Sequence, residues 1–203
     1  MSGGTVLFLG PADSPLLAWL RSRGGEVVQT EDRIDAAFVR AGGFQAVVSY
    51  GYRHILKADV LAAMPEVAVN LHISLLPWNR GADPNFWSFV DGTPKGVTIH
   101  CLADGVDTGD ILAQKEVAFA PDEDTLASTY ARLQAEIQDL FKESWPSILA
   151  GTCPRRPQAG GGSLHRMKDK ETLAHLLADG WKTPVRTLES CSCRGEEVIP
   201  GRK

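Results

Sequence analysis

An amide and an imidazole stand two residues apart in the stretch VNLHISLLP, where Asn70 and His72 follow a short apolar run. Side chains two residues apart in a β-strand point to the same side of the sheet. A neutral imidazole can give or take a proton near pH 7, and a carboxamide can donate an N–H to an oxygen that is gaining negative charge. The pair suits attack of a nucleophile on a carbonyl. Taken alone, it is equally compatible with a hydrogen-bonded histidine and a turn-capping asparagine.

A carboxylate, Asp107, lies farther along the chain in the turn-like stretch GVDTGD. A carboxylate beside His72 would orient the imidazole and raise its pKa, because the negative charge favours the imidazolium form. Gly105 and Gly109 allow the chain to bend tightly around the aspartate. An ordinary turn aspartate is the competing interpretation, and this stretch alone slightly favours it.

The irregular segment SLLPWNRG comes directly after His72. A loop that follows a strand end commonly forms a pocket wall. We therefore predict that this segment contacts the substrate through Ser74, Leu76, Pro77 and Arg80. Its apolar residues could equally pack against the core.

Apolar runs alternate with helical patterns over the first 73 residues. We expect strands at 5–9, 26–29, 44–50 and 67–73, with a helix ending near residue 23, a second capped by Asp32, and a third over 55–64. This alternation predicts an α/β fold, a Rossmann-like and mostly parallel sheet flanked by helices. Ligands of such sheets collect beyond the carboxyl ends of the strands, where Asn70 and His72 are placed.

The second half of the chain continues the pattern and then changes composition. We expect two strands, 96–102 and 110–119, on either side of the stretch ADGVDTG. Apolar residues at helical spacing from 122 to 141 predict a long helix, which should end before Pro146. From residue 151 the chain is rich in Gly, Pro, Arg and Ser, with a last short helix near 169–179 and a tail that frays from residue 190. We therefore predict a catalytic domain at 1–150 and a short C-terminal extension at 151–203.

Composition narrows the class of protein. The chain has 203 residues, 43% of them hydrophobic, with no apolar run long enough to span a bilayer, and its first residues lead us to expect no secretory leader. We therefore expect a cytoplasmic protein without a membrane partner. The formal charge of -4 argues against a nucleic-acid partner, although a few arginines could hold a small anion. The four cysteines form no C-x-x-C pair, so Cys191 and Cys193 give only a weak metal or redox signal.

The stretches NLHISLLPWNRGADP and GVTIHCLADGVDTGDILAQ together resemble the catalytic core of the folate-dependent N-formyltransferases. The resemblance is strong over residues 44–120 and looser over 1–150. It implies that 10-formyltetrahydrofolate donates a formyl group to a primary amine through a tetrahedral intermediate, without a metal. Asn70, His72 and Asp107 match the catalytic triad of the family. The resemblance implies that Asn70 and His72 stabilise the oxyanion. It also implies that Asp107 orients His72 and helps to relay the amine proton.

The same resemblance implies where the folate lies. The stretch SYGYRHIL matches the loop that borders the pterin, which makes its residues the expected cofactor contacts: Arg53, His54, Ile55 and Leu56. The opposite wall, where backbone groups read the pterin edge, matches Leu102, Ala103, Asp104 and Gly105. We interpret His100, on the strand before this wall, as a buried structural histidine.

The acceptor follows from smaller details. The stretches DPNFWS and GSLHRMKDKETLAHLLADGWKTP are similar to formyltransferases that act on amino sugars linked to a nucleotide. The half of the chain before Asn70 is shorter than is usual in the family, so an amino acid or an antibiotic-precursor amine remains an alternative acceptor. A 10-formyltetrahydrofolate hydrolase and a non-catalytic folate-binding protein are further alternatives. The sequence leaves a homodimer open.

Overall fold

A computed structural model describes residues 4–192 of the chain. The chain forms two compact units. Unit 1 comprises Met1–His72, Ile99–Ala113 and Phe141–Pro157, and unit 2 comprises Ile73–Thr98, Gln114–Leu140 and Gln158–Lys203. Cys193 and the side chain of Cys191 lie outside the described part, and with them the metal or redox interpretation of that pair.

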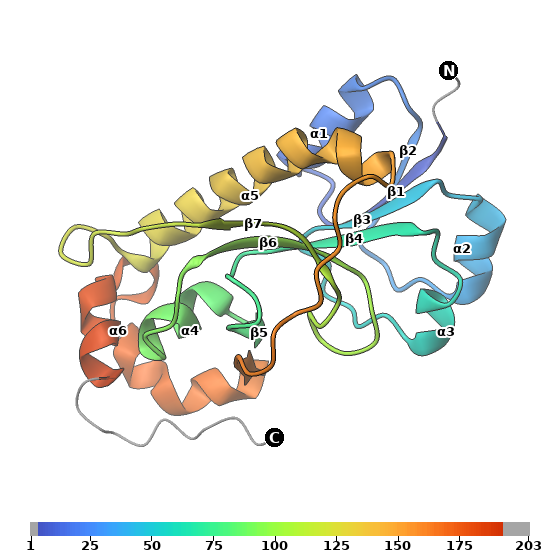
Figure 1. The fold of residues 1–203 in the computed structure, drawn as a ribbon. Helices are drawn as coiled ribbons and strands as arrows, with labels where there is room; N and C mark the ends of the chain where they lie inside the picture. The colour runs from blue at the N-terminus through green and yellow to red at the C-terminus, as the bar shows by residue number, and fades with distance from the viewer. Residues whose placement is uncertain (1–3, 193–203) are drawn as a thin grey trace. The chain divides into compact units, whose positions relative to one another are not determined.

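A six-stranded sheet has the strand order β2-β1-β3-β4-β6-β7 (Figure 1). Its strands are β1 (Val6–Leu9), β2 (Val27–Thr30), β3 (Ala46–Ser49), β4 (Val67–His72), β6 (Gly96–Cys101) and β7 (Ile111–Glu116). The β1–β2, β1–β3 and β3–β4 pairs are parallel. The fold prediction of a mostly parallel sheet flanked by helices is confirmed.

The helices of unit 1 cover the apolar strands. They are α1 (Pro15–Ser22), α2 (Ala36–Gly42) and α3 (Ala58–Leu61). Strands β1 and β3 are buried throughout, as expected for strands covered on both faces. Leu7 and Val47 pack with Val39 of α2 and Val60 of α3, so these two helices share one face of the sheet. The prediction that Asp32 caps α2 is wrong, because the carboxylate of Asp35 accepts the bond from the Phe38 N–H at 2.7 Å.

The long helix α5 (Leu126–Leu149) runs past the residue where we expected it to end. Pro146 lies inside it, although a proline removes one helical hydrogen bond. Tertiary packing accounts for the continuation. Trp145 is buried with its ring 5.0 Å from that of Phe141, and Ile148 in the following turn is buried as well.

Unit 2 is built around an apolar cluster that the sequence did not predict. Its elements are β5 (Arg80–Gly81), α4 (Pro84–Val90), β8 (Leu164–His165), the 3-10 helices η1 (Met167–Leu177) and η2 (Gly180–Lys182), and α6 (Val185–Ser192). Phe86 and Phe89 of α4 pack with Val185 and Leu188 of α6. The extension therefore shares a core with residues from inside the predicted 1–150 domain, and the compact units do not follow a boundary at 150. The last helix we expected at 169–179 is the 3-10 helix η1.

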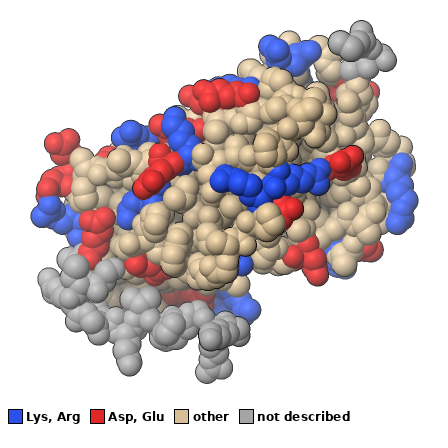
Figure 2. Space-filling view, viewed as in Figure 1, with Lys and Arg blue, Asp and Glu red and all other residues tan. Residues whose placement is uncertain are grey.

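On the face shown in Figure 2, acidic and basic side chains are interspersed. Within residues 4–192, no helix has the length and apolar character needed to cross a membrane.

Candidate active site

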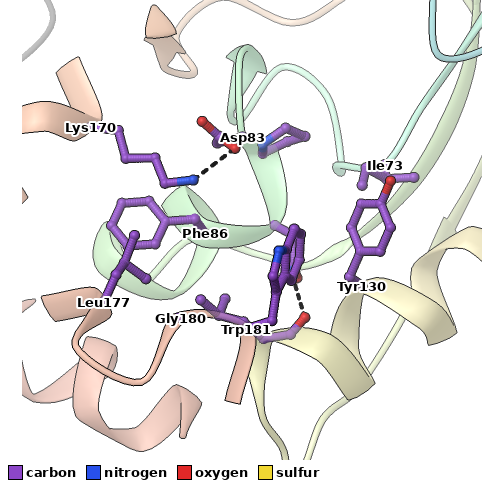
Figure 3. A pocket seen from close by; sticks show the side chains of 11 residues that line it. Ile73, Asp83, Phe86, Tyr130, Lys170, Leu177, Gly180 and Trp181 are labelled. Atoms are coloured by element: carbon purple, nitrogen blue, oxygen red, sulfur yellow. Dashed lines mark hydrogen bonds and ion pairs between the residues drawn. The ribbon is translucent and has the colours of Figure 1, made fainter. Parts of the chain in front are cut away.

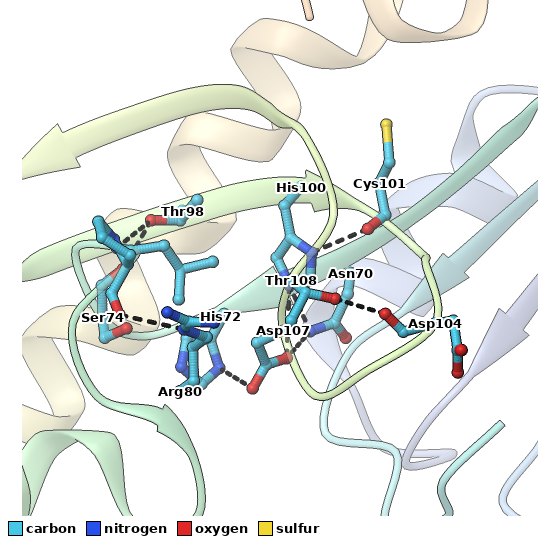
Figure 4. A network of polar contacts seen from close by, with 12 residues as sticks. Asn70, His72, Ser74, Arg80, Thr98, His100, Cys101, Asp104, Asp107 and Thr108 are labelled. Carbon is cyan, nitrogen blue, oxygen red and sulfur yellow. Dashed lines mark hydrogen bonds and ion pairs between the residues drawn. The ribbon is translucent and has the colours of Figure 1, made fainter. Parts of the chain in front are cut away.

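Asn70 and His72 lie at the carboxyl end of β4. Asn70 is aligned with Ser49, the last residue of β3, so both parallel strands end at the same edge of the sheet. His72 is 7% exposed, and Asn70 is half-buried. The alternation of β4 directs both side chains to one side, and Figure 4 shows them converging with Asp107.

The loop between β6 and β7 brings Asp107 to this edge. Asp107 has a φ of 52°, in the left-handed region that few residues other than glycine, asparagine and aspartate adopt. The Thr108 hydroxyl donates to the Asp104 carbonyl at 2.7 Å and closes the turn. A Cβ at position 109 would overlap the Cys101 carbonyl, so Gly109 lets the loop lie directly against the end of β6. The tight bend expected around the aspartate is present.

The carboxylate of Asp107 contacts three side chains. Its Oδ2 lies 3.6 Å from His72 Nδ1. Its Oδ1 accepts a hydrogen bond from Asn70 Nδ2 at 3.2 Å and lies 3.4 Å from His100 Nε2. Because a carboxylate oxygen only accepts, the Asn70 amide must turn its nitrogen toward Asp107. The structure thus brings together the three residues that the sequence singled out, and their catalytic role stays a prediction.

His100 is the member of the network that sequence reasoning assigned only a structural role. It is 2% exposed, and its Nε2 lies 3.1 Å from Asn70 Nδ2. Its Nδ1 lies 2.9 Å from the Cys101 carbonyl, which can only accept, so Nδ1 carries the proton. In the neutral ring Nε2 is then an acceptor for one N–H of Asn70. The adjacency of β4 and β6 in the sheet places His100 beside Asn70, and single-strand periodicity does not reveal it.

The expected folate contacts follow the ends of β3 and β6 in unit 1. Leu56 and Leu102 are half-buried and pack on the cluster that includes Leu7 and Leu9 of β1 and Val47 of β3. His54 meets the ring of Tyr52 edge-on at 5.3 Å, and the Tyr52 hydroxyl donates to the Asp32 carbonyl at 2.7 Å. Burial raises the pKa of Tyr52, which keeps that hydroxyl a donor. The other expected contacts are exposed: Arg53, Ile55, Ala103, Asp104 and Gly105.

The expected substrate segment belongs to unit 2, and much of it is buried. Ser74 and Leu76 are 1% and 3% exposed. The Thr98 hydroxyl donates to the Ser74 carbonyl at 2.7 Å and accepts from the Leu76 N–H at 3.1 Å. Arg80 donates to the Pro77 carbonyl at 3.2 Å and to the Gly161 carbonyl at 2.8 Å. These contacts give Ser74 and Leu76 a part in shaping the segment, and substrate contact by Pro77 and Arg80 stays a prediction.

A family model described as formyl transferase matches residues 26–144, which include Asn70, His72, His100 and Asp107. The chain is also 46% identical to the formyltransferase PseJ from Anoxybacillus kamchatkensis, with a TM-score of 0.88 over 93% of this chain and 100% of that one. The chain belongs to the formyl transferase family. The resemblance seen in the sequence is therefore confirmed.

Other members of the formyl transferase family are more distant or longer. A 4-N formyltransferase from Francisella tularensis is 20% identical with a TM-score of 0.75 over 92% of this chain and 86% of that chain, a likeness of fold. The methionyl-tRNA formyltransferase of Anaeromyxobacter sp. (strain K) is 37% identical over 91% of this chain and 59% of its own length. The chain thus spans about three fifths of the curated relatives that it matches.

Proposed function

We propose that this protein transfers a formyl group from 10-formyltetrahydrofolate to the primary amine of a sugar linked to a nucleotide. The observation that carries the proposal is the shared carboxylate of Asp107, which contacts His72, His100 and Asn70 at one sheet edge. The solved structure of PseJ contains UDP-4,6-dideoxy-4-formamido-L-AltNAc and tetrahydrofolate, a formylated sugar nucleotide together with a folate. That chain is covered over its whole length by this one.

The reaction requires that the protein stabilise one oxyanion and assist the transfer of one proton. The amine lone pair forms a bond to the formyl carbon, and the carbonyl oxygen becomes negatively charged. Collapse of this intermediate breaks the bond to N10 of the folate, which takes up a proton while the new amide nitrogen loses one. Donors aimed at the developing oxyanion supply much of the rate enhancement of such reactions. Asn70 and His72 are the donors that we assign to it, and one Asn70 N–H then leaves its partner, Asp107 or His100, to reach the oxyanion.

Asp107 acts through the groups that it contacts. Its carboxylate beside His72 Nδ1 favours a proton on that nitrogen and stabilises the imidazolium. The same carboxylate, with His100, fixes which side of the Asn70 amide carries the N–H groups. Asp107 is 14% exposed, so its charge is only partly screened by solvent. We assign it the relay of the amine proton.

The residues expected around the folate fit a flat heterocycle. A pterin offers two apolar faces and an edge of donors and acceptors. Leu56 and Leu102 give half-buried apolar surface, and Ile55 is 83% exposed, as a ligand-covered residue would be in the free protein. The exposed backbone of 103–105 can supply groups for the edge. When bound, the folate supplies the activated formyl group, and these residues orient it.

The nature of the acceptor separates this proposal from its alternatives. A tRNA acceptor is suggested by the curated relatives, but this chain carries a formal charge of -4, which disfavours a nucleic-acid partner. An amino acid, an antibiotic-precursor amine and water are the remaining acceptors. The interspersed charges of Figure 2 agree better with a small acceptor than with a nucleic acid.

Turnover with a panel of acceptors tests the proposal. The purified protein is mixed with 10-formyltetrahydrofolate and either amino sugars linked to UDP or dTDP, free amino acids, initiator methionyl-tRNA or no acceptor. Mass spectrometry should find a formamide on an amino sugar nucleotide, with little formate in the absence of acceptor. Formate released at the same rate without any acceptor would establish a hydrolase. Formylation of the tRNA or of amino acids alone would refute the sugar acceptor.

A further inference from the structure

A cavity of about 160 Å³ lies within unit 2. It is bordered by α4, the first turns of α5 and the 3-10 helices η1 and η2 (Figure 3). Most of its lining is apolar or aromatic and comes from Phe86, Leu126, Tyr130, Leu177 and Trp181. Neither the triad nor the expected folate contacts belong to this lining, so the cavity is a separate feature that the formyl-transfer chemistry does not explain.

The dimensions and the aromatic wall favour a flat ring. A cavity of about 150 Å³ holds one benzene ring, so this cavity suits a single ring better than a fused pair. Tyr130 and Trp181 meet edge to face with centroids 5.1 Å apart. They are 39% and 58% exposed, unusually open for large aromatic side chains. Exposed aromatic faces of this kind bind rings by stacking.

A polar edge completes the cavity. Asn85 is 4% exposed, and its Nδ2 donates to the Leu126 carbonyl at 3.1 Å, while its Oδ1 has no partner in the described part of the chain. Asp83 Oδ1 accepts from Lys170 Nζ at 3.0 Å, and its buried Oδ2 likewise lacks a partner there. An unsatisfied buried acceptor is costly, and a ligand N–H would satisfy it.

Donor and acceptor stand side by side at this edge. Lys170 has three N–H donors and Asp83 uses one of them. A ring with an N–H next to a carbonyl would donate to one of the two unpartnered oxygens and accept from Lys170. The imide edge of a uracil-type pyrimidine has this arrangement, with an N–H between two carbonyl oxygens.

We propose that this cavity binds the pyrimidine base of a uracil-type nucleotide and excludes purines by size. Trp181 stacks on the ring with Tyr130 at its edge, Asp83 or Asn85 accepts its N–H, and Lys170 donates to a ring carbonyl. That the nucleotide belongs to the formyl acceptor rests on the proposed function. The binding site itself rests on the cavity.

Calorimetric titration of the full chain with UMP and with AMP, in the absence of folate, tests the proposal. UMP should bind and AMP should bind at least about tenfold more weakly. Trp181→Ala should weaken UMP binding about fivefold or more, on the usual scale of base stacking, whereas Trp181→Phe should retain most of it. Met167→Ala removes an exposed apolar side chain outside the lining and should leave binding unchanged.

A second pair of variants tests the polar edge. Lys170→Met should weaken UMP binding several-fold, and Lys168→Met, an exposed lysine of the same helix outside the lining, should not. Equal affinity for UMP and AMP, or unchanged UMP affinity in both Trp181→Ala and Lys170→Met, would overturn the assignment.

Failure of this inference is distinguishable from failure of the proposed function. Formyl transfer to a sugar nucleotide without measurable UMP binding would overturn the cavity assignment and leave the proposed function standing. UMP binding that follows the pattern above, in a protein that formylates no sugar nucleotide, would support the cavity assignment and refute the proposed acceptor.

Discussion

The network around Asp107 in unit 1 and the cavity edge around Asp83 in unit 2 each hold a carboxylate, an amide and a cationic or basic side chain. In unit 1 these groups satisfy one another, since Asp107 and His100 both accept from the Asn70 amide and Asp107 lies beside His72. In unit 2 an oxygen of Asp83 and one of Asn85 are buried without a partner in the described part of the chain.

This difference is the one expected between a catalytic site and a binding site. A self-contained network fixes tautomers and amide orientation before any ligand arrives, as an oxyanion and proton site requires. An incomplete edge gains its hydrogen bonds only from a ligand, as a selective binding site requires. Variants in the two regions should therefore change different quantities.

Asp107→Asn should give the largest effect. Asparagine tolerates the left-handed φ of 52°, so the loop can keep its shape while the negative charge beside His72 is lost. Turnover should fall by about 10² or more, as for other general acid–base groups. Steady-state rates measure the loss, and UMP affinity should match the wild type. A parallel loss of UMP binding would show that the two regions are not functionally separate.

Asn70→Ala should give the next largest effect. The change removes the N–H groups that we assign to the oxyanion, and loss of one such donor typically lowers kcat by about 10²–10³. We expect kcat to fall with little change in KM for either substrate. A raised KM at constant kcat would instead place Asn70 in ground-state binding.

His100→Gln should have a smaller effect, because His100 positions Asn70. The glutamine carbonyl can still accept from the amide, but the bond to the Cys101 carbonyl is lost. We expect kcat to fall about tenfold, the scale of one hydrogen bond, without a change in KM. A lower Tm with unchanged kcat would reduce His100 to a structural role.

The smallest expected effect is on the reactivity of the thiol of Cys101, the residue next to His100. Burial raises the pKa of its thiol, so the thiolate fraction is reduced at every pH below that pKa. Iodoacetamide should alkylate Cys101 more slowly than free cysteine, and the pH at which the rate is half its maximum should lie above about 8.5, the ordinary thiol pKa. Peptide mapping after timed alkylation measures this rate. A half-maximal rate at or below that pH would contradict the effect of burial.

The sequence predicted the parallel strands well because their apolar runs are nearly continuous. Strand alternation, a local feature, predicted that Asn70 and His72 lie on the same side of the sheet. The place of Asp107 beside them was expected from the family resemblance, because the stretch around Asp107 alone slightly favours an ordinary turn aspartate. His100 was interpreted as structural because its neighbours come from another strand. Pairing between β4 and β6 is a long-range feature that no local pattern encodes.

The regions that escaped prediction depend on tertiary packing. The helix through Pro146 persists because Trp145 and Ile148 are buried, which local propensity cannot register. Helix α4 begins at Pro84 after an aspartate with positive φ, and its residues 85–90 are all buried. Its apolar sequence lacks helical periodicity because every side of the helix is covered. The cavity of unit 2 combines residues from four separate stretches and was invisible for the same reason.

The central claim is that the Asp107 network moves a formyl group from folate to an amine. Isotopically labelled 10-formyltetrahydrofolate, incubated with the protein and an amino sugar nucleotide, tests it most directly when wild type and His72→Ala are compared. Label should appear as formamide on the sugar with the wild type, and at least about 10²-fold more slowly with His72→Ala. Equal rates of labelling by the two proteins would contradict the account.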